Sequence, residues 1–251
     1  MTEISQLFGA RADAYASFRP RYPNELFAWL AANSPNTDSA LDVACGSGQA
    51  SQPLLAHFQQ VLACDASVEQ LSASRELAGV QRFAADAKQL PLANQSLDLM
   101  IVAQALHWFA SADFFAEVQR LLRPGGLFCA WCYGLMRIDD AVDSVINRFY
   151  WQTLGGYWPS GRASIDAGYS DIHLPFAAIP VPAFAMQAQW SFEHLLGYLR
   201  TWSASQLWER KNGHDPVTDL APVLQQAWGD IKQPRFIHWP LHFVAGSPPH
   251  R

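Results

Sequence analysis

Charged side chains are scarce in this 251-residue chain: 16% of the residues are Asp, Glu, Lys or Arg, and the formal net charge is −5. A chain without an excess of positive charge lacks the electrostatic footprint of nucleic-acid binding or of attachment to an anionic membrane. We therefore expect neither nucleic acid nor a membrane among its partners. Half of the residues are hydrophobic, which excludes global disorder and predicts a buried core.

Hydrophobic runs long enough to cross a bilayer are also missing. The most apolar stretch, 97–116, is interrupted by Asp98, Gln104, His107 and Asp113. It predicts a buried strand followed by a helix rather than a membrane span. The first eleven residues lack a basic segment followed by an apolar run, so we expect no signal peptide and a cytoplasmic protein.

Cysteine is represented by four residues, of which Cys129 and Cys132 form a C-x-x-C pair. A zinc site would need a second pair of ligands, and a redox pair is typically placed at the start of a helix. The pair lies instead in the apolar, strand-like run 127–133. We expect buried free thiols in a reducing compartment and no metal site.

Strand, turn and helix recur through the first half of the chain. Ser67 and Gln70 have the spacing of a capping box at a helix start, and the apolar positions from Phe114 to Leu122 follow one helix face. The alternation predicts an α/β fold, a doubly wound and mostly parallel seven-stranded Rossmann-like sheet with ligands at the carboxyl ends of its strands. The expected strands are 40–44, 61–64, 80–84, 97–103 and 127–132, with a helix at 53–58 and a turn at 124–126.

The pattern changes after about residue 135. Residues 155–183 are rich in Gly, Pro and aromatic residues, which is typical of an irregular cap. Apolar and polar residues alternate over 184–190 and over 237–245, and each alternation predicts a strand with one buried face. Pro240 falls inside the second of these strands and favours a sheet edge or a bulge.

A glycine-containing turn follows the first expected strand, in the segment from Leu41 to Gln49. Gly46 and Gly48 would let a ligand approach the backbone closely, next to the free N–H groups of a helix start. Such a turn is weak evidence by itself. An NAD-dependent dehydrogenase is an alternative, but the third glycine of its G-x-G-x-x-G fingerprint is replaced by Ser51.

Acidic residues stand at the ends of the first three expected strands: Asp42, Asp65 and Asp86. A carboxylate at Asp65 can accept hydrogen bonds from both hydroxyls of a ribose, because it has two acceptor oxygens. Asp86 could accept a hydrogen bond from an adenine amino group. Each acid alone could be a helix cap or a solvated loop residue, but in this order they favour an adenosine ligand.

With these motifs the chain resembles the class I S-adenosylmethionine-dependent methyltransferases, and most of all the bacterial and fungal group that includes trans-aconitate methyltransferases. The family motif acid-x-Gly-x-Gly-x-Gly matches Asp42, Gly46 and Gly48, with Ala44 in place of the first glycine. Residues 104–109 resemble the group's A-x-H-W-F run, and residues 122–126 its turn before strand five. The N-terminal segment 8–23 resembles its Y…RP-x-YP lid, so the resemblance covers roughly residues 5–135.

The resemblance implies a methyltransferase with S-adenosylmethionine as cofactor, S-adenosylhomocysteine as product and a small molecule as acceptor. It also implies a single domain with an N-terminal helical lid (1–35), a cofactor-binding core (36–135), a substrate cap inserted after strand five (136–183) and C-terminal strands and helices (184–251). The implied cofactor-binding residues are Tyr15, Arg19, Asp42, Ala44, Gly46, Gly48, Asp65, Ala66, Asp86, Ala87, Gln104, Ala105 and His107.

His107 is the candidate catalytic residue, because it is the histidine of the loop after the fourth strand, beside the expected methyl position. It could orient or deprotonate the acceptor, or simply pack against the cofactor. Trp108, Trp158, Arg162 and Tyr169 are candidate substrate residues. An arginine in the cap could bind a carboxylate through two hydrogen bonds, although a solvated loop arginine is the plainer alternative.

We expect methyl transfer to an oxygen of a small metabolite, a carboxylate in the first place. Alternative acceptors are a ring carbon of a quinone-type compound and an acid bound to a carrier protein. A protein of another class, a non-catalytic module that binds the cofactor, would share the same glycine turn. The sequence contains no feature that specifies an oligomeric state.

Overall fold

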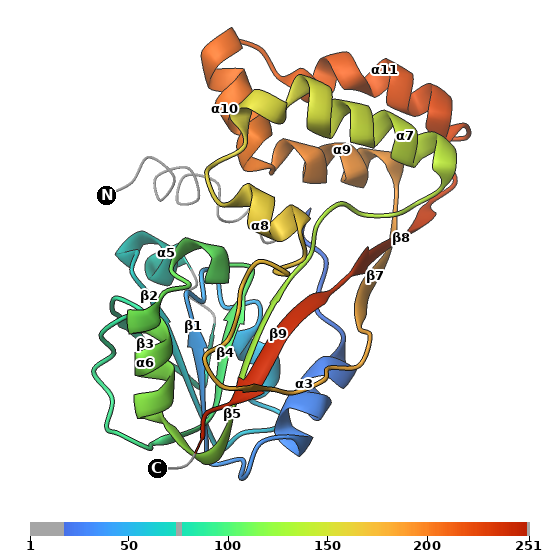
Figure 1. The fold of residues 1–251 in the computed structure, drawn as a ribbon. Helices are drawn as coiled ribbons and strands as arrows, with labels where there is room; N and C mark the ends of the chain where they lie inside the picture. Colours follow the sequence, from blue (N-terminus) through green and yellow to red (C-terminus); the bar gives the residue numbers. More distant parts are fainter. Residues whose placement is uncertain (1–17, 74–76, 250–251) are drawn as a thin grey trace. The chain divides into compact units, whose positions relative to one another are not determined.

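The structure is a computed structural model, and it describes residues 18–73 and 77–249 (Figure 1). The chain forms two compact units that interleave along the sequence. We call the first the helical unit and the second the sheet unit. The helical unit comprises Met1–Arg21, Leu135–Arg162 and Ala185–Pro240, and the sheet unit comprises Tyr22–Gly134, Ala163–Phe184 and Leu241–Arg251.

The sheet unit is built on a seven-stranded sheet with the strand order β3-β2-β1-β4-β5-β9-β6. β1 to β5 run parallel to their neighbours, whereas β9 is antiparallel to both β5 and β6. The predicted mostly parallel, Rossmann-like sheet is therefore confirmed. The strands are β1 (Ser39–Val43), β2 (Gln60–Asp65), β3 (Val80–Ala84), β4 (Leu97–Ala103), β5 (Leu122–Cys132), β6 (Ala177–Ala178) and β9 (His242–Ser247).

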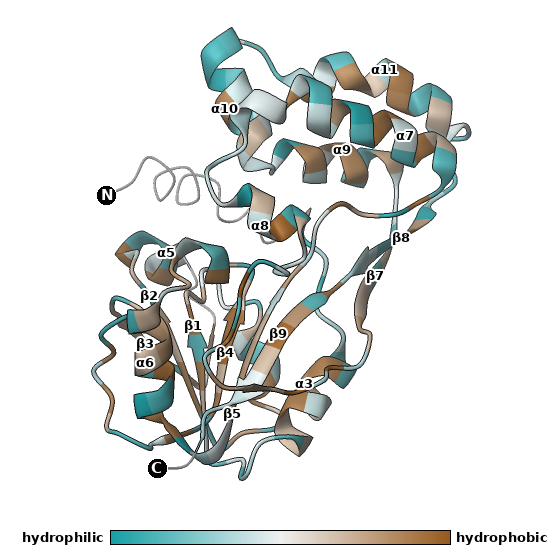
Figure 2. Ribbon diagram, in the orientation of Figure 1, coloured by the Kyte–Doolittle hydropathy of each residue, from teal (hydrophilic) through white to brown (hydrophobic). Residues whose placement is uncertain are grey.

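Both faces of this sheet are covered, which explains why most residues of the central strands are apolar. On one face, Phe114 and Phe115 of α6 pack against Phe128 of β5. On the other, Phe27 of α3 packs against Trp131, whose side chain points the opposite way along the same strand. Figure 2 shows β4 as a hydrophobic strand and α6 with alternating hydrophilic and hydrophobic positions. The helices of this unit are α3 (Asn24–Ala32), α4 (Ser51–Leu54), α5 (Val68–Ala73), α6 (Ala112–Leu121) and η1 (Leu106–Trp108), with most of α8 (Arg162–Asp166).

Two helix starts are capped by serine side chains. The side chain of Ser67 accepts a hydrogen bond from the backbone N–H of Gln70, as the capping-box spacing predicts. Ser111 caps α6 by accepting from Phe114 N. The helix expected at 53–58 is shorter and earlier, because α4 spans Ser51–Leu54.

The prediction of one strand over 237–245 is wrong, because the chain passes from one sheet to another at Pro240. The alternation over 237–245 predicts one strand, but β8 (Arg235–Pro240) ends at this proline and β9 begins at His242. β8 pairs with β7 (Ala185–Trp190) in a separate two-stranded sheet, whereas β9 joins the large sheet. Proline has no backbone N–H for a sheet ladder, so a strand end is where it costs least.

The helical unit packs its helices around aromatic side chains. Trp190 and Tyr198 both contact Trp239 of β8, and Phe192 packs against Trp228. Arg235 binds Asp139, the N-cap residue of α7. The helices are α7 (Asp140–Arg148), the π-helical turn η2 (Phe149–Thr153), η3 (Gly155–Tyr157), α9 (Phe192–Arg200), α10 (Ser203–Asn212) and α11 (Pro216–Trp228).

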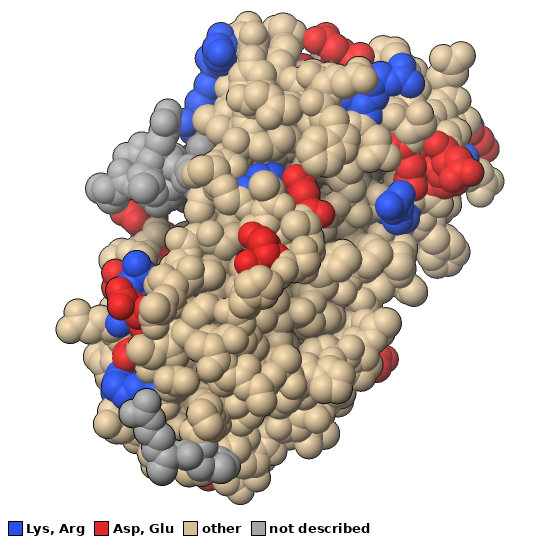
Figure 3. Space-filling model, in the orientation of Figure 1, with Lys and Arg blue, Asp and Glu red and all other residues tan. Residues whose placement is uncertain are grey.

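Over the described residues, no helix is both long and apolar enough to cross a membrane. The four cysteines are free and buried, as the sequence predicts, and burial raises the pKa of the Cys129 thiol well above its ordinary range. On the face drawn in Figure 3, charged side chains form small groups within a largely uncharged surface. The expected division into lid, core, cap and C-terminal part remains a prediction.

Candidate cofactor and active site

The turn after β1 has the backbone of a ligand-binding loop. Ala44, Gly46 and Gly48 all have positive φ angles, of 55°, 53° and 80°. Glycine adopts positive φ angles without a steric penalty, whereas a residue with a Cβ is destabilised there by about 1 kcal/mol. Ala44 therefore carries a small backbone strain at the position where the family motif has glycine.

The two glycines of this turn have different surroundings. A Cβ on Gly48 would come within 2.0 Å of a methyl group of Leu77, whereas a Cβ on Gly46 would meet no atom of residues 18–73 or 77–249 within 4 Å. A side chain at Gly48 would therefore require Leu77 to move. Gly46 borders open space, which is what a backbone that receives a ligand needs.

Asp65, at the end of β2, holds this turn in place. Its Oδ2 accepts a hydrogen bond of 2.9 Å from the N–H of Gly46, and its Oδ1 accepts one of 2.9 Å from the N–H of Ser67. Two carboxylate oxygens offer about four acceptor positions, so these bonds leave capacity for ligand hydroxyls. The structure thereby brings together two residues that the sequence assigned separately to the cofactor.

Asp42, the last acid before the turn, is fully buried. Its Oδ2 accepts a hydrogen bond of 2.5 Å from the hydroxyl of Ser51, while its Oδ1 has no hydrogen-bond partner among the described residues. Burial raises the pKa of Asp42 to about 7; the bond from Ser51 opposes that rise, and the negative charge of Asp65 adds to it. A buried carboxyl with an unused oxygen favours a cationic or hydrogen-donating group close by.

The third acid, Asp86, lies in an exposed turn after β3. Its Oδ1 accepts a hydrogen bond from the N–H of Lys88, and the residue forms a backbone bridge with Gln89. Ala87 is partly buried and packs against the core of the sheet unit, whereas Ala66, after β2, is exposed.

The loop after β4 is anchored by Gln104, which has a positive φ of 60°. Its side-chain amide donates to the backbone carbonyl of Tyr133 and accepts from the backbone N–H of the same residue, at 3.0 and 2.9 Å. Its own N–H donates to Trp131 O. The loop then turns through the buried Ala105 into η1, which carries His107.

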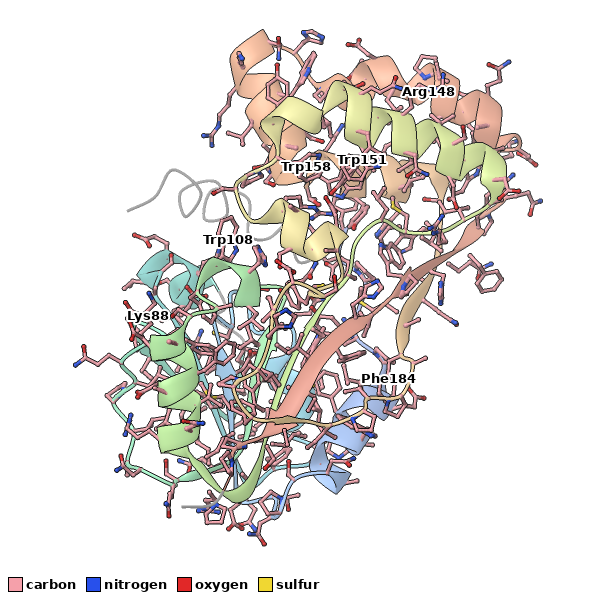
Figure 4. The ribbon with its side chains drawn as sticks, viewed as in Figure 1. Lys88, Trp108, Arg148, Trp151, Trp158 and Phe184 are labelled. Atoms are coloured by element: carbon pink, nitrogen blue, oxygen red, sulfur yellow. The ribbon has the colours of Figure 1, made fainter. Side chains whose placement is uncertain are left out.

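His107 is half-buried and contacts two aromatic residues. Its Nδ1 lies 3.2 Å from the hydroxyl oxygen of Tyr169, and its ring centroid lies 4.6 Å from that of Trp108. Trp108 is 44% exposed and is labelled in Figure 4. Tyr169 is 1% exposed, so of the two aromatic neighbours only Trp108 presents a ring to solvent.

The remaining candidates lie in the helical unit. Arg162 donates from Nε to the hydroxyl of Tyr150 at 2.5 Å, and its guanidinium carbon lies 4.7 Å from the ring centroid of Trp158. Trp158, labelled in Figure 4, donates from its indole to the backbone carbonyl of Tyr150 at 3.1 Å. Arg19 lies over the ring of Tyr198, and Tyr15 lies outside the described residues.

Ser51 is the residue of this site that the sequence analysis missed. In the sequence, Ser51 is notable only because it stands where an NAD fingerprint has its third glycine. It lies three residues after Gly48, at the start of α4, and its partner Asp42 is nine residues earlier, beyond the reach of any local sequence pattern.

Comparison with known proteins identifies the family. The family described as "Methyltransferase domain" matches residues 41–130. A protein of Dictyostelium discoideum named as a methyltransferase is 30% identical over 239 residues, which cover 92% of this chain and 91% of the relative. This chain is a methyltransferase. A solved structure from Anaeromyxobacter dehalogenans, named as a type II methyltransferase, is 40% identical with a TM-score of 0.86 and covers 92% and 99% of the two chains.

The methyltransferase uses S-adenosylmethionine, and the residues at its strand ends fit that cofactor. A protein of Saccharomyces cerevisiae named as an S-adenosylmethionine-dependent methyltransferase is 23% identical over 83% of this chain and 84% of the relative. Gly46 borders the open space that the cofactor needs, and Asp42 offers a buried acceptor for a cationic ligand. S-adenosylmethionine carries both a ribose and a positive charge, so the donor set matches its chemistry.

Proposed function

We propose that the methyltransferase transfers the methyl group to a carboxylate oxygen of a small organic acid. The observation that carries this proposal is the setting of Arg162. Its guanidinium is bonded to Tyr150 and lies over the rings of Tyr150 and Trp158, at 5.2 and 4.7 Å from their centroids. An arginine that is oriented before substrate arrives loses less conformational entropy on binding.

Arginine suits this acceptor because its N–H groups form a rigid fork that matches the two oxygens of a carboxylate. The aromatic rings under it favour a cation that stays in one place, since cation–π contacts contribute about 0.5–2 kcal/mol. The resemblance to the trans-aconitate methyltransferase group supports the same substrate class.

A carboxylate acceptor also simplifies the chemistry. When bound, S-adenosylmethionine supplies a methyl group on a positively charged sulfur; the C–S bond breaks as the O–C bond forms, and the bonding electrons stay with sulfur. A carboxylate is anionic at neutral pH, so no base has to remove a proton from it. The protein then contributes binding, orientation and exclusion of water.

Within this proposal the residues have defined roles. Asp65 binds the ribose hydroxyls, Asp86 and Ala87 flank the adenine, and the N–H groups of the glycine turn face the rest of the cofactor. The candidate substrate residues contact the acceptor. We propose further that the protein is cytoplasmic and that its partners include neither nucleic acid nor a membrane. The other proposed cofactor contacts are Tyr15, Arg19, Asp42, Ala44, Ala66, Gln104, Ala105 and His107, and the substrate contacts are Trp108, Trp158, Arg162 and Tyr169.

The test is a methyl-transfer assay with purified protein, labelled S-adenosylmethionine and a panel of mono-, di- and tricarboxylic acids, with quinone-type phenols as competitors. We expect a labelled product whose methyl group is released by mild alkali, as a methyl ester requires. Label that stays on a ring carbon after alkali would overturn the carboxylate proposal and favour the quinone-type acceptor.

Variants at Arg162 sharpen the assay. Arg162→Gln should raise the KM for the acid about tenfold or more, because the loss of one charge-assisted contact costs about 1.5–3 kcal/mol. Arg162→Lys keeps the charge but loses the planar fork and should be intermediate. The Kd for S-adenosylmethionine serves as the internal control and should be unchanged in both variants.

A further inference from the structure

The buried hydroxyl of Tyr169 has a specific relationship to the ring of His107. Tyr169 is 1% exposed, and its hydroxyl oxygen lies 3.2 Å from Nδ1 of His107. The two residues are 62 positions apart in the sequence. A buried hydroxyl proton needs an acceptor, because an unsatisfied polar group in the protein interior costs about 1–3 kcal/mol.

The surroundings of the phenol oxygen decide which partner donates. Burial raises the pKa of Tyr169 well above its ordinary range, so the hydroxyl keeps its proton. The nearby backbone of His107 and Leu106 partly offsets that rise in pKa. In the described part of the chain, Nδ1 of His107 is the acceptor within reach of the hydroxyl proton.

We propose that Tyr169 is a positioning residue: its hydroxyl donates to Nδ1 of His107 and holds the imidazole as the neutral tautomer that carries its proton on Nε2. The two nitrogens of a neutral imidazole have opposite roles, so a donor at Nδ1 fixes Nε2 as an N–H group. His107 then offers a hydrogen-bond donor from Nε2 rather than a base.

The backbone around Tyr169 is shaped to present this hydroxyl. Tyr169 has a φ of 60°, which is costly for a residue with a Cβ, and it follows Gly168, whose φ is 61°. A Cβ on Gly168 would come within 2.8 Å of the ring of His242, so a side chain there would require His242 to shift. The N–H of Tyr169 donates to Ser164 O at 2.9 Å.

The loop that carries His107 is also anchored by Gln104, three residues before the histidine. Gln104 also has a positive φ of 60°, and its side-chain amide binds both backbone groups of Tyr133. Two strained residues without a glycine's freedom therefore frame His107, and strain of this kind persists where the surrounding structure enforces a geometry.

The catalytic role of the Nε2 N–H group, unlike the tautomer itself, rests on the proposed function. An N–H donor from Nε2 suits an acceptor that is already anionic, because it can bind the carboxylate oxygen that does not attack. It does not suit a phenol or an amine that must lose a proton. Tyr169 therefore acts through His107 rather than by direct contact with the substrate.

The tautomer can be measured without any acceptor or cofactor. We would record ¹⁵N–¹H NMR spectra of the ¹⁵N-histidine-labelled protein and assign the ring of His107 by its disappearance in His107→Gln. We expect the signature of an unprotonated Nδ1 and a protonated Nε2. A protonated Nδ1 in the unaltered protein would overturn the proposal, whatever the acceptor of the enzyme is.

Tyr169→Phe tests the hydroxyl itself, because it keeps the ring and removes only the donor. We expect mixed tautomers at His107 and a kcat about tenfold lower, with little change in the KM of the acceptor. The matched control is Tyr22→Phe, a buried tyrosine that packs against Trp131 and should leave the His107 signals unchanged. An unaltered His107 tautomer in Tyr169→Phe would contradict the proposal.

A pair of variants at His107 separates a donor from a base. Glutamine can place an amide N–H near the position of Nε2 but cannot accept a proton, so His107→Gln should keep most of the kcat that His107→Ala loses. Equal losses in the two variants would contradict the donor role. Failure of the carboxylic-acid panel alone would overturn the proposed function and leave the NMR result standing.

Discussion

The hydroxyl of Ser51 donates a hydrogen bond of 2.5 Å to Oδ2 of Asp42, and both side chains are fully buried. The serine lies at the start of α4, and the aspartate lies in β1. Their bond connects the strand before the glycine turn with the helix after it. Ser51, which replaces the third glycine of the NAD fingerprint, thus links β1 to α4.

Ser51→Ala should weaken cofactor binding. The bond from Ser51 lowers the pKa of Asp42, so its loss leaves more of the carboxyl protonated near neutral pH. A neutral carboxyl attracts a positively charged ligand less. We expect the Kd for S-adenosylmethionine to rise about tenfold at pH 7.5, which corresponds to the roughly 1–1.5 kcal/mol of one hydrogen bond.

Isothermal titration calorimetry with S-adenosylmethionine and S-adenosylhomocysteine checks this, because the product lacks the positive charge on sulfur. The loss should be larger for the charged ligand. Ser72→Ala, at an exposed position of α5, is the matched control. Equal losses for both ligands would argue against an electrostatic role of Asp42.

The stability of the protein should fall as pH rises through the range in which Asp42 titrates. The pKa of Asp42 is raised from 3.8 to about 7 in the folded protein, so between these values the folded state holds a proton that the unfolded state has released. The free energy of unfolding therefore falls by up to about 1.4 kcal/mol per pH unit from this group.

Urea denaturation from pH 4.5 to 8 measures this dependence. Asp42→Asn removes the titrating group and should flatten the curve across that window. Asp113→Asn, at an exposed position of α6, should leave the curve of the unaltered protein in place. A steep curve that persists in Asp42→Asn would assign the dependence to other groups.

Gly46→Ala should separate binding from folding. A Cβ at Gly46 meets no atom of the described part of the chain within 4 Å, so the substitution adds the cost of a left-handed alanine, about 1 kcal/mol, without a clash there. The new methyl group occupies the space next to the turn. We expect a fold that persists and a Kd for S-adenosylmethionine that rises at least tenfold.

Gly125 offers a control of the same backbone type for this variant. Its φ is 76°, and a Cβ there would make only an ordinary contact with Pro35 at 3.6 Å. Gly125 lies at the amino end of β5, so Gly125→Ala should reduce stability by a similar amount with no effect on binding. Comparable losses of affinity in the two variants would contradict the assignment of Gly46.

Arg123 should be important for stability rather than for activity. Asp98 is fully buried in β4 and accepts hydrogen bonds from Arg123, from Asp38 N and from Ser39 N. Arg123→Gln leaves this carboxyl without its cationic partner and should lower the free energy of unfolding by about 1–3 kcal/mol.

Chemical denaturation of Arg123→Gln and Arg200→Gln provides the comparison. Arg200 binds Asp215 in a more exposed pair, for which a loss below about 1 kcal/mol is typical. Equal effects of the two substitutions would show that burial of Asp98 does not strengthen its interaction with Arg123.

The sequence by itself determined the fold class and the places of the first five strands, although β5 begins at Leu122, five residues before its expected start, and includes the turn expected at 124–126. The runs at 80–84 and 97–103 match β3 and β4 residue for residue. β4 is buried along nearly its whole length and is therefore mostly apolar, whereas β3 is a largely exposed edge strand that the preceding glycine helps to delimit. An adenosine-type ligand also followed from local order, since Asp42, Asp65 and Asp86 stand at successive strand ends that a parallel sheet brings to one edge. The resemblance to the methyltransferase family implied S-adenosylmethionine as that ligand.

Only the tertiary structure decided how distant residues pair. The bond between Tyr169 and His107, and that between Asp98 and Arg123, join residues 62 and 25 positions apart, and no local periodicity encodes either. The alternation around Pro240 was equally uninformative, because it continues across a proline at which the chain leaves one sheet for another. Local patterns report which face of an element is buried, whereas the partner on that face depends on how the whole chain packs.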